Sequence, residues 1–118
     1  MKTKSVLIID DEEGIRETLQ LALEFEGYDV HTAANGKEGF EALERIRRPC
    51  LILLDLMMPT MNGWEFAVAI GESEHHRAIP VVVISAFDDQ AKGLPVHSVL
   101  KKPIDLSMLL DIVHQCCA

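Results

Sequence analysis

Five polar residues that could bind a metal ion and transfer a phosphoryl group stand at the ends of apolar runs: Asp10, Asp11, Asp55, Ser85 and Lys102. Clustered carboxylates repel one another, and their pKa values rise unless a cation neutralises them. Mg²⁺ suits such a set, because it binds one or two carboxylates and a phosphate while keeping several waters. A carboxylate can also be the nucleophile that forms an aspartyl phosphate, while a lysine and a hydroxyl contact the phosphoryl oxygens. These residue types therefore predict phosphoryl transfer to Asp55 if the fold brings them together.

The apolar runs predict buried strands of a parallel sheet. They cover residues 5–9, 51–55 and 80–85, and the mixed segment 96–100 is expected to be a further strand. A run with no polar face suits a parallel sheet that is covered by helices on both sides. The carboxyl ends of parallel strands lie along one edge, where open α/β sheets place their ligands. We therefore expect the polar residues at the strand ends to share one crevice.

Amphipathic segments between the strands predict the helices. These segments cover residues 13–26, 37–48, 64–70 and 106–113, the last of them capped by Asp105. The apolar stripe of the first helix comprises Ile15, Leu19, Ala22, Leu23 and Phe25. Glu12 and Glu13 are interpreted as charges that favour the start of this helix, and Gly27 ends it. With a more polar edge strand at 28–34, the alternation predicts a doubly wound α/β fold.

Length and charge limit the classes of function. The chain has 118 residues, of which 48% are apolar and 25% charged, as expected for one globular domain. A net charge of −8 argues against direct binding of nucleic acid, which needs clustered Lys and Arg. No apolar run has the length of a secretory h-region or a membrane helix. We therefore predict a cytoplasmic protein without a signal peptide.

The cysteines and histidines give no metal-type spacing. Cys50, Cys116 and Cys117 are an odd number, and in a cytosolic chain we expect them to be reduced. Cys50 is expected to be a small core residue, and Cys116 and Cys117 to be exposed thiols. The adjacent His75 and His76 lack the i, i+4 spacing of helical zinc sites.

The motifs, taken in order, resemble the receiver domains of two-component response regulators, including the chemotaxis regulators. The resemblance covers essentially the whole chain and is carried by Asp10-Asp11, by Asp55-Leu56-Met57-Met58-Pro59 with Met61 and Gly63, by Ser85-Ala86 and by Lys102-Pro103. It implies that residues 1–118 form one receiver domain with a flavodoxin-like sheet of order 2-1-3-4-5.

The resemblance also implies a role for each motif residue. Asp55 would accept a phosphoryl group from a histidine kinase or a phosphotransfer protein, so that the domain catalyses only its own phosphorylation and dephosphorylation. Asp10, Asp11, Asp55 and the backbone carbonyl of Met57 would hold Mg²⁺. Lys102 would contact the phosphoryl group, and its bond to Pro103 would be cis. Ser85 would move toward the phosphate as the switch, changing the interaction with a downstream protein or an output domain.

Two features depart from the family pattern. Only sixteen residues separate Ser85 from Lys102, so a fourth helix within 86–95 is expected to be a single turn or irregular. Val99 stands where the family commonly has an aromatic residue or histidine, and valine has no ring to rotate. We therefore expect the output to depend on ordering of the 86–95 segment.

Two other functions remain open on the sequence. An Mg²⁺-dependent phosphatase could use Asp55 as its nucleophile, although Met57 stands where a leaving-group acid would be needed. A phosphorylation-independent interaction module would suit Val99 and the short 86–95 segment. The sequence is equally compatible with a free-standing regulator and with the N-terminal part of a longer one, and it leaves the cognate kinase, the target and the oligomeric state open.

Overall fold

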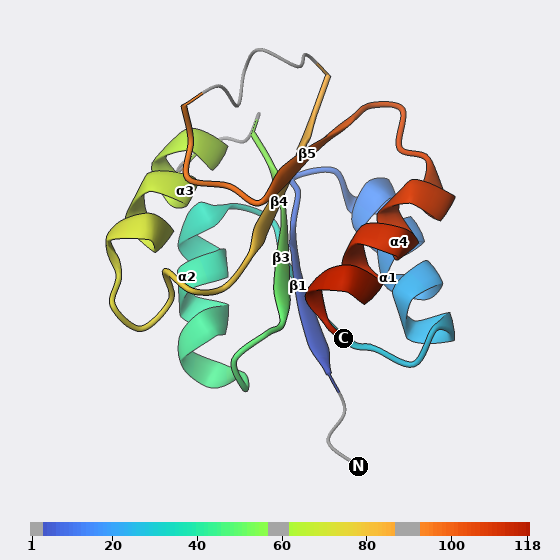
Figure 1. The fold of residues 1–118 in the computed structure, drawn as a ribbon, viewed down its shortest axis with the longest axis horizontal. Helices are drawn as coiled ribbons and strands as arrows, with labels where there is room; N and C mark the ends of the chain where they lie inside the picture. The colour runs from blue at the N-terminus through green and yellow to red at the C-terminus, as the bar shows by residue number, and fades with distance from the viewer. Residues whose placement is uncertain (1–3, 57–61, 87–92) are drawn as a thin grey trace.

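The chain forms a five-stranded parallel sheet (Figure 1). The computed structural model describes residues 4–56, 62–86 and 93–118. The strands are β1 (Ser5–Ile9), β2 (Asp29–Ala33), β3 (Leu51–Asp55), β4 (Val81–Ser85) and β5 (Ser98–Lys101). Their order in the sheet is β2-β1-β3-β4-β5, and all four pairings are parallel. The predicted doubly wound fold with strand order 2-1-3-4-5 is therefore confirmed.

Two layers of helices cover the sheet. The described residues form α1 (Glu13–Phe25), α2 (Gly36–Arg45), α3 (Gly63–Glu72) and α4 (Leu106–Cys116). Helices α2 and α3 lie on one face, and α1 and α4 lie on the other (Figure 1). Three of the helices begin with a side-chain cap, which satisfies amide donors that the first turn leaves unpaired: Asn35 caps α2, Asn62 caps α3 and Asp105 caps α4.

The core lies on both faces of the sheet. Successive side chains of a strand point to opposite faces, so Leu7, Ile52 and Val83 join the cluster under α2 and α3. Their neighbours Ile8 and Leu53 join the cluster under α1 and α4. Every one of these side chains has 0% exposure. This burial on two faces explains why β1, β3 and β4 have no polar face in the sequence.

Some predicted boundaries differ from the structure. Helix α2 ends at Arg45 rather than residue 48, because Ile46 is already extended and Pro49 disfavours helical geometry in the residue before it. Phe25 is 91% exposed, so its assignment to the apolar stripe of α1 is wrong. It follows the buried Leu23 by two residues, about 200° around the helix at 3.6 residues per turn.

The predicted single-turn or irregular helix falls mostly on residues 87–92, which lie outside the described residues. Ala86 and residues 93–97 form no helix, and Gly93 has a positive φ of 84°. None of the helices in the described part of the chain combines the length and the apolar character that crossing a bilayer requires.

The expectation of reduced cysteines is wrong in this structure. Cys50 and Cys117 form a disulfide across a sequence separation of 67, with their Cα atoms 5.3 Å apart, a usual spacing for this bond. Cys117 is also buried, with 4% exposure, and belongs to the core cluster under α4 instead of being an exposed thiol. Cys116 is the one free cysteine. The parallel topology brings the start of β3 beside the end of α4, which a sequence pattern cannot reveal.

Candidate functional site

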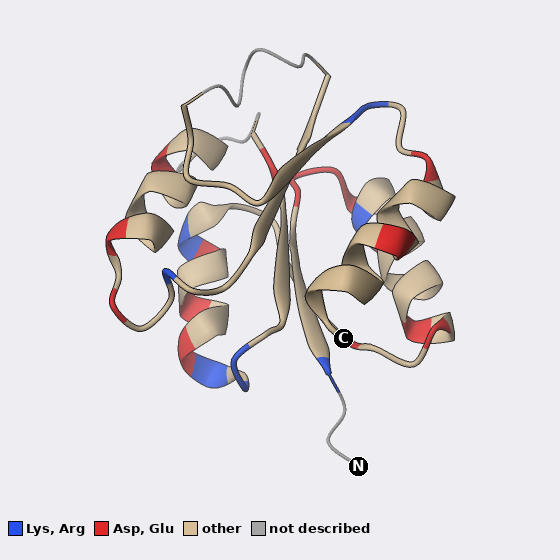
Figure 2. Ribbon diagram, in the orientation of Figure 1, with Lys and Arg blue, Asp and Glu red and all other residues tan. Residues whose placement is uncertain are grey.

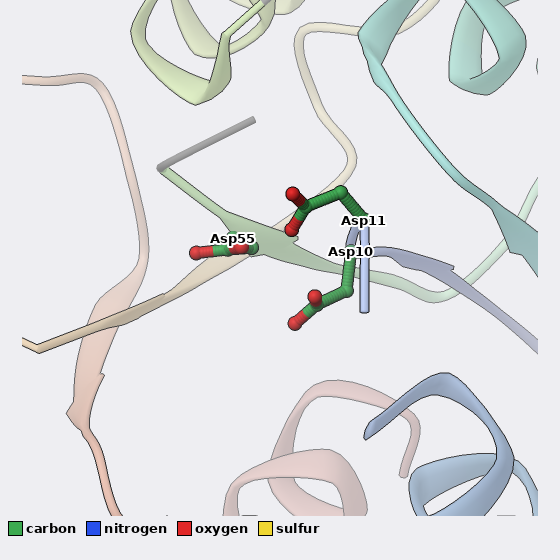
Figure 3. A group of neighbouring side chains, drawn as sticks. All are labelled: Asp10, Asp11 and Asp55. Atoms are coloured by element: carbon green, nitrogen blue, oxygen red, sulfur yellow. The ribbon is translucent and has the colours of Figure 1, made fainter. Parts of the chain in front are cut away.

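Three carboxylates meet at the edge of the sheet where β1 and β3 end. Asp10 directly follows β1, and Asp55 is the last residue of β3. One oxygen from each of Asp10, Asp11 and Asp55 lies within 4.8 Å of the others. Figure 2 shows acidic segments at this edge, and Figure 3 shows the three side chains converging from the two strand ends. Asp10 and Asp55 are buried, with 1% and 3% exposure, whereas Asp11 is exposed.

The carboxylate of Asp10 is only half satisfied. Its Oδ1 accepts a hydrogen bond of 2.9 Å from the backbone N–H of Glu12, but its buried Oδ2 has no partner among the described residues. Burial raises the pKa of Asp10, the Glu12 N–H and the Lys102 charge oppose that rise, and the charge of Asp11 adds to it. The backbone of Asp10 is fixed by an N–H bond to Ala33 O at 3.1 Å.

Lys102 supplies a positive charge at the same edge. Its Nζ lies 3.6 Å from Asp55 Oδ1 and 3.9 Å from Glu12 Oε1. Its backbone N–H donates a 2.8 Å hydrogen bond to Ser85 O, which ties the residue after β5 to the end of β4. Ser85 itself has 1% exposure. The Lys102–Pro103 peptide bond is cis, as the resemblance implied.

The start of α3 packs closely on the strand end that carries Asp55. The Gly63 N–H donates a 3.0 Å hydrogen bond to Leu56 O. A Cβ atom at position 63 would overlap the Leu56 Cα and the Asp55 carbonyl oxygen. Only glycine therefore allows this approach, which fixes the end of β3 against α3.

The donor set fits a hard divalent cation. Three carboxylates supply only oxygen ligands, as Mg²⁺ prefers, and the buried unpartnered Asp10 Oδ2 is an oxygen that a cation would satisfy. Met57, whose backbone carbonyl is a predicted ligand, lies outside the described residues.

Asp10, Asp11, Asp55, Ser85 and Lys102 thus lie at one edge of the sheet. Two neighbours that were not predicted as site residues join them. Glu12, interpreted only as a helix-start charge, lies beside Lys102. Arg16 donates from Nη1 to the Asp10 carbonyl oxygen at 2.7 Å. Both lie within one or two helical turns of Asp10, and that proximity in sequence was the signal that could have suggested them.

Comparison with known proteins places this arrangement in a family. Residues 6–114 match the response regulator receiver domain model. The chain is 34% identical over 120 residues to the response regulator Rre1 of Synechocystis, which covers 97% of this chain and 52% of Rre1. It is 38% identical over 84 residues to the transcriptional regulatory protein SrrA of Staphylococcus aureus, covering 71% of this chain and 33% of SrrA. The chain therefore spans about half of Rre1 and a third of SrrA.

Solved structures agree with the sequence comparison. The chemotaxis protein CheY4 of Vibrio cholerae superposes with a TM-score of 0.89 at 27% identity, over 98% of this chain and 99% of that one. A response regulator receiver protein from Pseudomonas putida gives 0.89 at 30% identity, over 98% of both chains. The response regulator TrrA of Thermotoga maritima, in complex with Mg²⁺-BeF, gives 0.86 at 26% identity, over 97% of this chain and 99% of that one. The chain belongs to the response regulator receiver domain family of two-component signal transduction.

Proposed function

We propose that residues 1–118 act as one receiver domain in which Asp55 accepts a phosphoryl group from the phosphohistidine of a histidine kinase or a phosphotransfer protein. One observation carries this proposal: a buried carboxylate at the end of β3 lies within 4.8 Å of two other carboxylates and 3.6 Å from a lysine ammonium group. An ion pair with a purely structural role needs one carboxylate beside the lysine, not three. Phosphoryl transfer, in contrast, needs several carboxylates to bind a metal ion and a separate positive charge for the phosphoryl oxygens.

The transfer step needs little covalent chemistry from the protein. An Asp55 carboxylate oxygen attacks phosphorus, the phosphorus–nitrogen bond of the phosphohistidine breaks, and the imidazole nitrogen keeps the electron pair and takes up a proton. Asp10, Asp11 and Asp55, with the backbone carbonyl of Met57, would hold Mg²⁺. When bound, Mg²⁺ neutralises the carboxylates and the phosphoryl oxygens.

Lys102 and Ser85 are assigned to the phosphoryl oxygens. Lys102 already lies beside Asp55, so it neutralises charge where the phosphoryl group arrives. Ser85 is the last residue of the neighbouring strand β4, and its carbonyl oxygen accepts a hydrogen bond from the Lys102 N–H. We assign its hydroxyl as the switch that donates a hydrogen bond to the phosphoryl group. Glu12 shares Lys102 with Asp55 in this structure.

The output differs from that of family members with an aromatic switch. Val99 is 37% exposed on β5 and has no ring to rotate inward. We assign the readout to the 86–95 segment, between the Ser85 switch and β5. The partners are then a histidine kinase or phosphotransfer protein on the input side and a downstream protein or output domain on the other, in the cytoplasm.

Intact-mass spectrometry after incubation with a small phosphodonor tests this function. We expect an Mg²⁺-dependent gain of one phosphoryl group that is absent in Asp55→Asn. No gain under conditions where Trp64 fluorescence reports bound Mg²⁺ would refute the proposal and favour a phosphorylation-independent module. Turnover of external phosphate esters would instead favour the phosphatase.

A further inference from the structure

A second chemical site lies at the opposite end of the sheet from the carboxylates. A cavity of about 330 Å³ opens beside the amino-terminal ends of β1 and β3. The residues used in the argument are Lys4, Arg47, Arg48, Cys50, Cys116 and Cys117, all of which line it. The cavity therefore combines three basic residues with all three cysteines of the chain.

The disulfide in this cavity can be reached from one side. Cys117 is buried, with 4% exposure, while Cys50 is half-buried and directly precedes β3. The Cys50 Sγ lies 3.2 Å from the Ser5 carbonyl oxygen, and the Lys4 ammonium group bonds to the Cys117 carbonyl oxygen. Both cysteines line the cavity, and Cys50 is the more exposed of the two, so we take the Cys50 sulfur as the point of attack and the Cys117 sulfur as the leaving group.

The charge around the disulfide is positive, although the chain carries a net charge of −8. Lys4, Arg47 and Arg48 are exposed, and the other lining residues, Ser5, Ala118 and the three cysteines, include no Asp or Glu among the described residues. Figure 2 shows basic segments where the chain enters β1 and β3, at the end away from the acidic strand ends. Concentrated positive charge raises the local concentration of an anionic reactant and stabilises a departing thiolate.

Cys116 does not supply the attacking thiolate itself. Its Sγ lies 3.9 Å from both ring nitrogens of His97, and burial raises the pKa of the Cys116 thiol. The thiol is therefore protonated near neutral pH, so a nucleophile for the disulfide has to come from solution.

We propose that this cavity is a thiol–disulfide exchange site that selects low-molecular-weight thiols carrying carboxylates. The incoming thiolate attacks the Cys50 Sγ and forms a mixed disulfide, the Cys50–Cys117 bond breaks, and Cys117 leaves as a thiolate that takes up a proton. The carboxylates of the incoming thiol face Arg47 and Arg48. The end of α4 is then no longer linked covalently to the start of β3.

A charge series of thiols tests the proposal on the purified, folded protein. Mercaptosuccinate, 2-mercaptoethanol and cysteamine differ in charge, and each rate is divided by the rate of the same thiol with an uncharged small disulfide. This division removes differences in intrinsic nucleophilicity. At low salt, the normalised rate for mercaptosuccinate should exceed that for cysteamine by about tenfold or more, and the preference should shrink in roughly 0.5 M salt.

Variants and peptide mapping locate the selection. The Arg47→Gln/Arg48→Gln double variant should lose most of the preference for mercaptosuccinate. The Lys37→Gln/Arg77→Gln double variant makes the same change in net charge at residues that do not line the cavity, so it should keep that preference. After acid quenching and alkylation, the mixed disulfide should map to Cys50.

Four results would each overturn the proposal. Equal normalised rates across the series would remove the selection by charge, and exchange that occurs only in denaturant would make the disulfide purely structural. A peptide map of the oxidised protein without the Cys50–Cys117 linkage, or with the mixed disulfide on Cys116, would exclude the proposed reaction.

Discussion

Replacing Asp10 by asparagine should raise the free energy of unfolding when Mg²⁺ is absent. The Asp10 Oδ2 atom is buried without a partner in the described structure, and such an atom costs about 1–3 kcal/mol. Each neighbouring carboxylate lies within 4.8 Å, where two unit charges repel by about 3.5 kcal/mol at an effective dielectric constant of 20. The Lys102 charge offsets part of this repulsion. Asparagine keeps the acceptor for the Glu12 N–H, so the net gain should be about 1–3 kcal/mol.

Mg²⁺ should shrink this difference in stability or reverse it. A ligand at a hundred times its dissociation constant stabilises the folded protein by about 2.7 kcal/mol. Wild type should receive this gain, whereas the Asp10→Asn variant lacks one of the charged ligands and should receive much less. Urea unfolding with a chelator and with saturating Mg²⁺ measures both differences. If Asp10→Asn were less stable than wild type in the chelator, or gained as much from Mg²⁺, the assignment of Asp10 as an uncompensated metal ligand would be refuted.

The pH dependence of the same pair of proteins gives the sign of the effect. Since the pKa of Asp10 is raised from 3.8 on folding, the folded state holds the proton more tightly than the unfolded state. The contribution of Asp10 to stability is therefore lost as the pH rises from about 3.8 through the raised pKa. Without Mg²⁺, the advantage of Asp10→Asn should be small in acid and grow through this window. Asp11→Asn is the matched control, because its exposed carboxylate should change stability less.

Three further variants test the disulfide, the core and the close approach of α3 to Asp55. Cys50→Ser should lower the free energy of unfolding by about 4 kcal/mol in non-reducing urea titrations, because a disulfide across 67 residues restricts the unfolded chain by about that amount. The difference should vanish when both proteins are reduced. Phe66→Ala should cost about 3–5 kcal/mol, because this ring has 0% exposure; a loss below about 1 kcal/mol in thermal or urea unfolding would contradict the packing. Gly63→Ala should displace the end of β3 and weaken Mg²⁺ binding, measured by Trp64 fluorescence, so unchanged affinity would argue against the close approach to Asp55.

The fold could be predicted because the apolar runs indicate both where the buried strands lie and where each of them ends. Runs such as residues 51–55 have no polar face, which indicates burial on both sides, and each ends in a polar residue. The helix boundaries were less certain. At Phe25 an apolar residue was assigned to a stripe that its angular position excludes, and at Ile46 the chain leaves the helix early on its way to the start of β3.

The carboxylate site was predictable because parallel topology turns strand ends into neighbours. Asp10 and Asp55 needed only the correct strand assignment to meet. The contact between Glu12 and Lys102 was not predictable, because it depends on the rotamers of two long side chains across a loop. The disulfide was missed for another reason. In the sequence, Cys50 and Cys117 are 67 residues apart and look the same as two reduced cysteines. Only the placement of β3 beside the end of α4 shows that they can pair.

The two ends of β3 carry opposite chemistry. Cys50 precedes this strand and Asp55 ends it, and five steps of about 3.3 Å place the two residues roughly 16 Å apart. That separation exceeds the screening length of about 8 Å at physiological ionic strength, so the basic cavity cannot neutralise the carboxylates through solvent. A link between the two sites would therefore have to be mechanical. The available route is α4, which follows Lys102 by three intervening residues and whose C-terminal cap, Cys117, is fixed to Cys50. Opening the disulfide would free the far end of the helix while leaving the charges around Asp55 unchanged. Its effect on phosphorylation would then come from the packing of α4 and not from electrostatics.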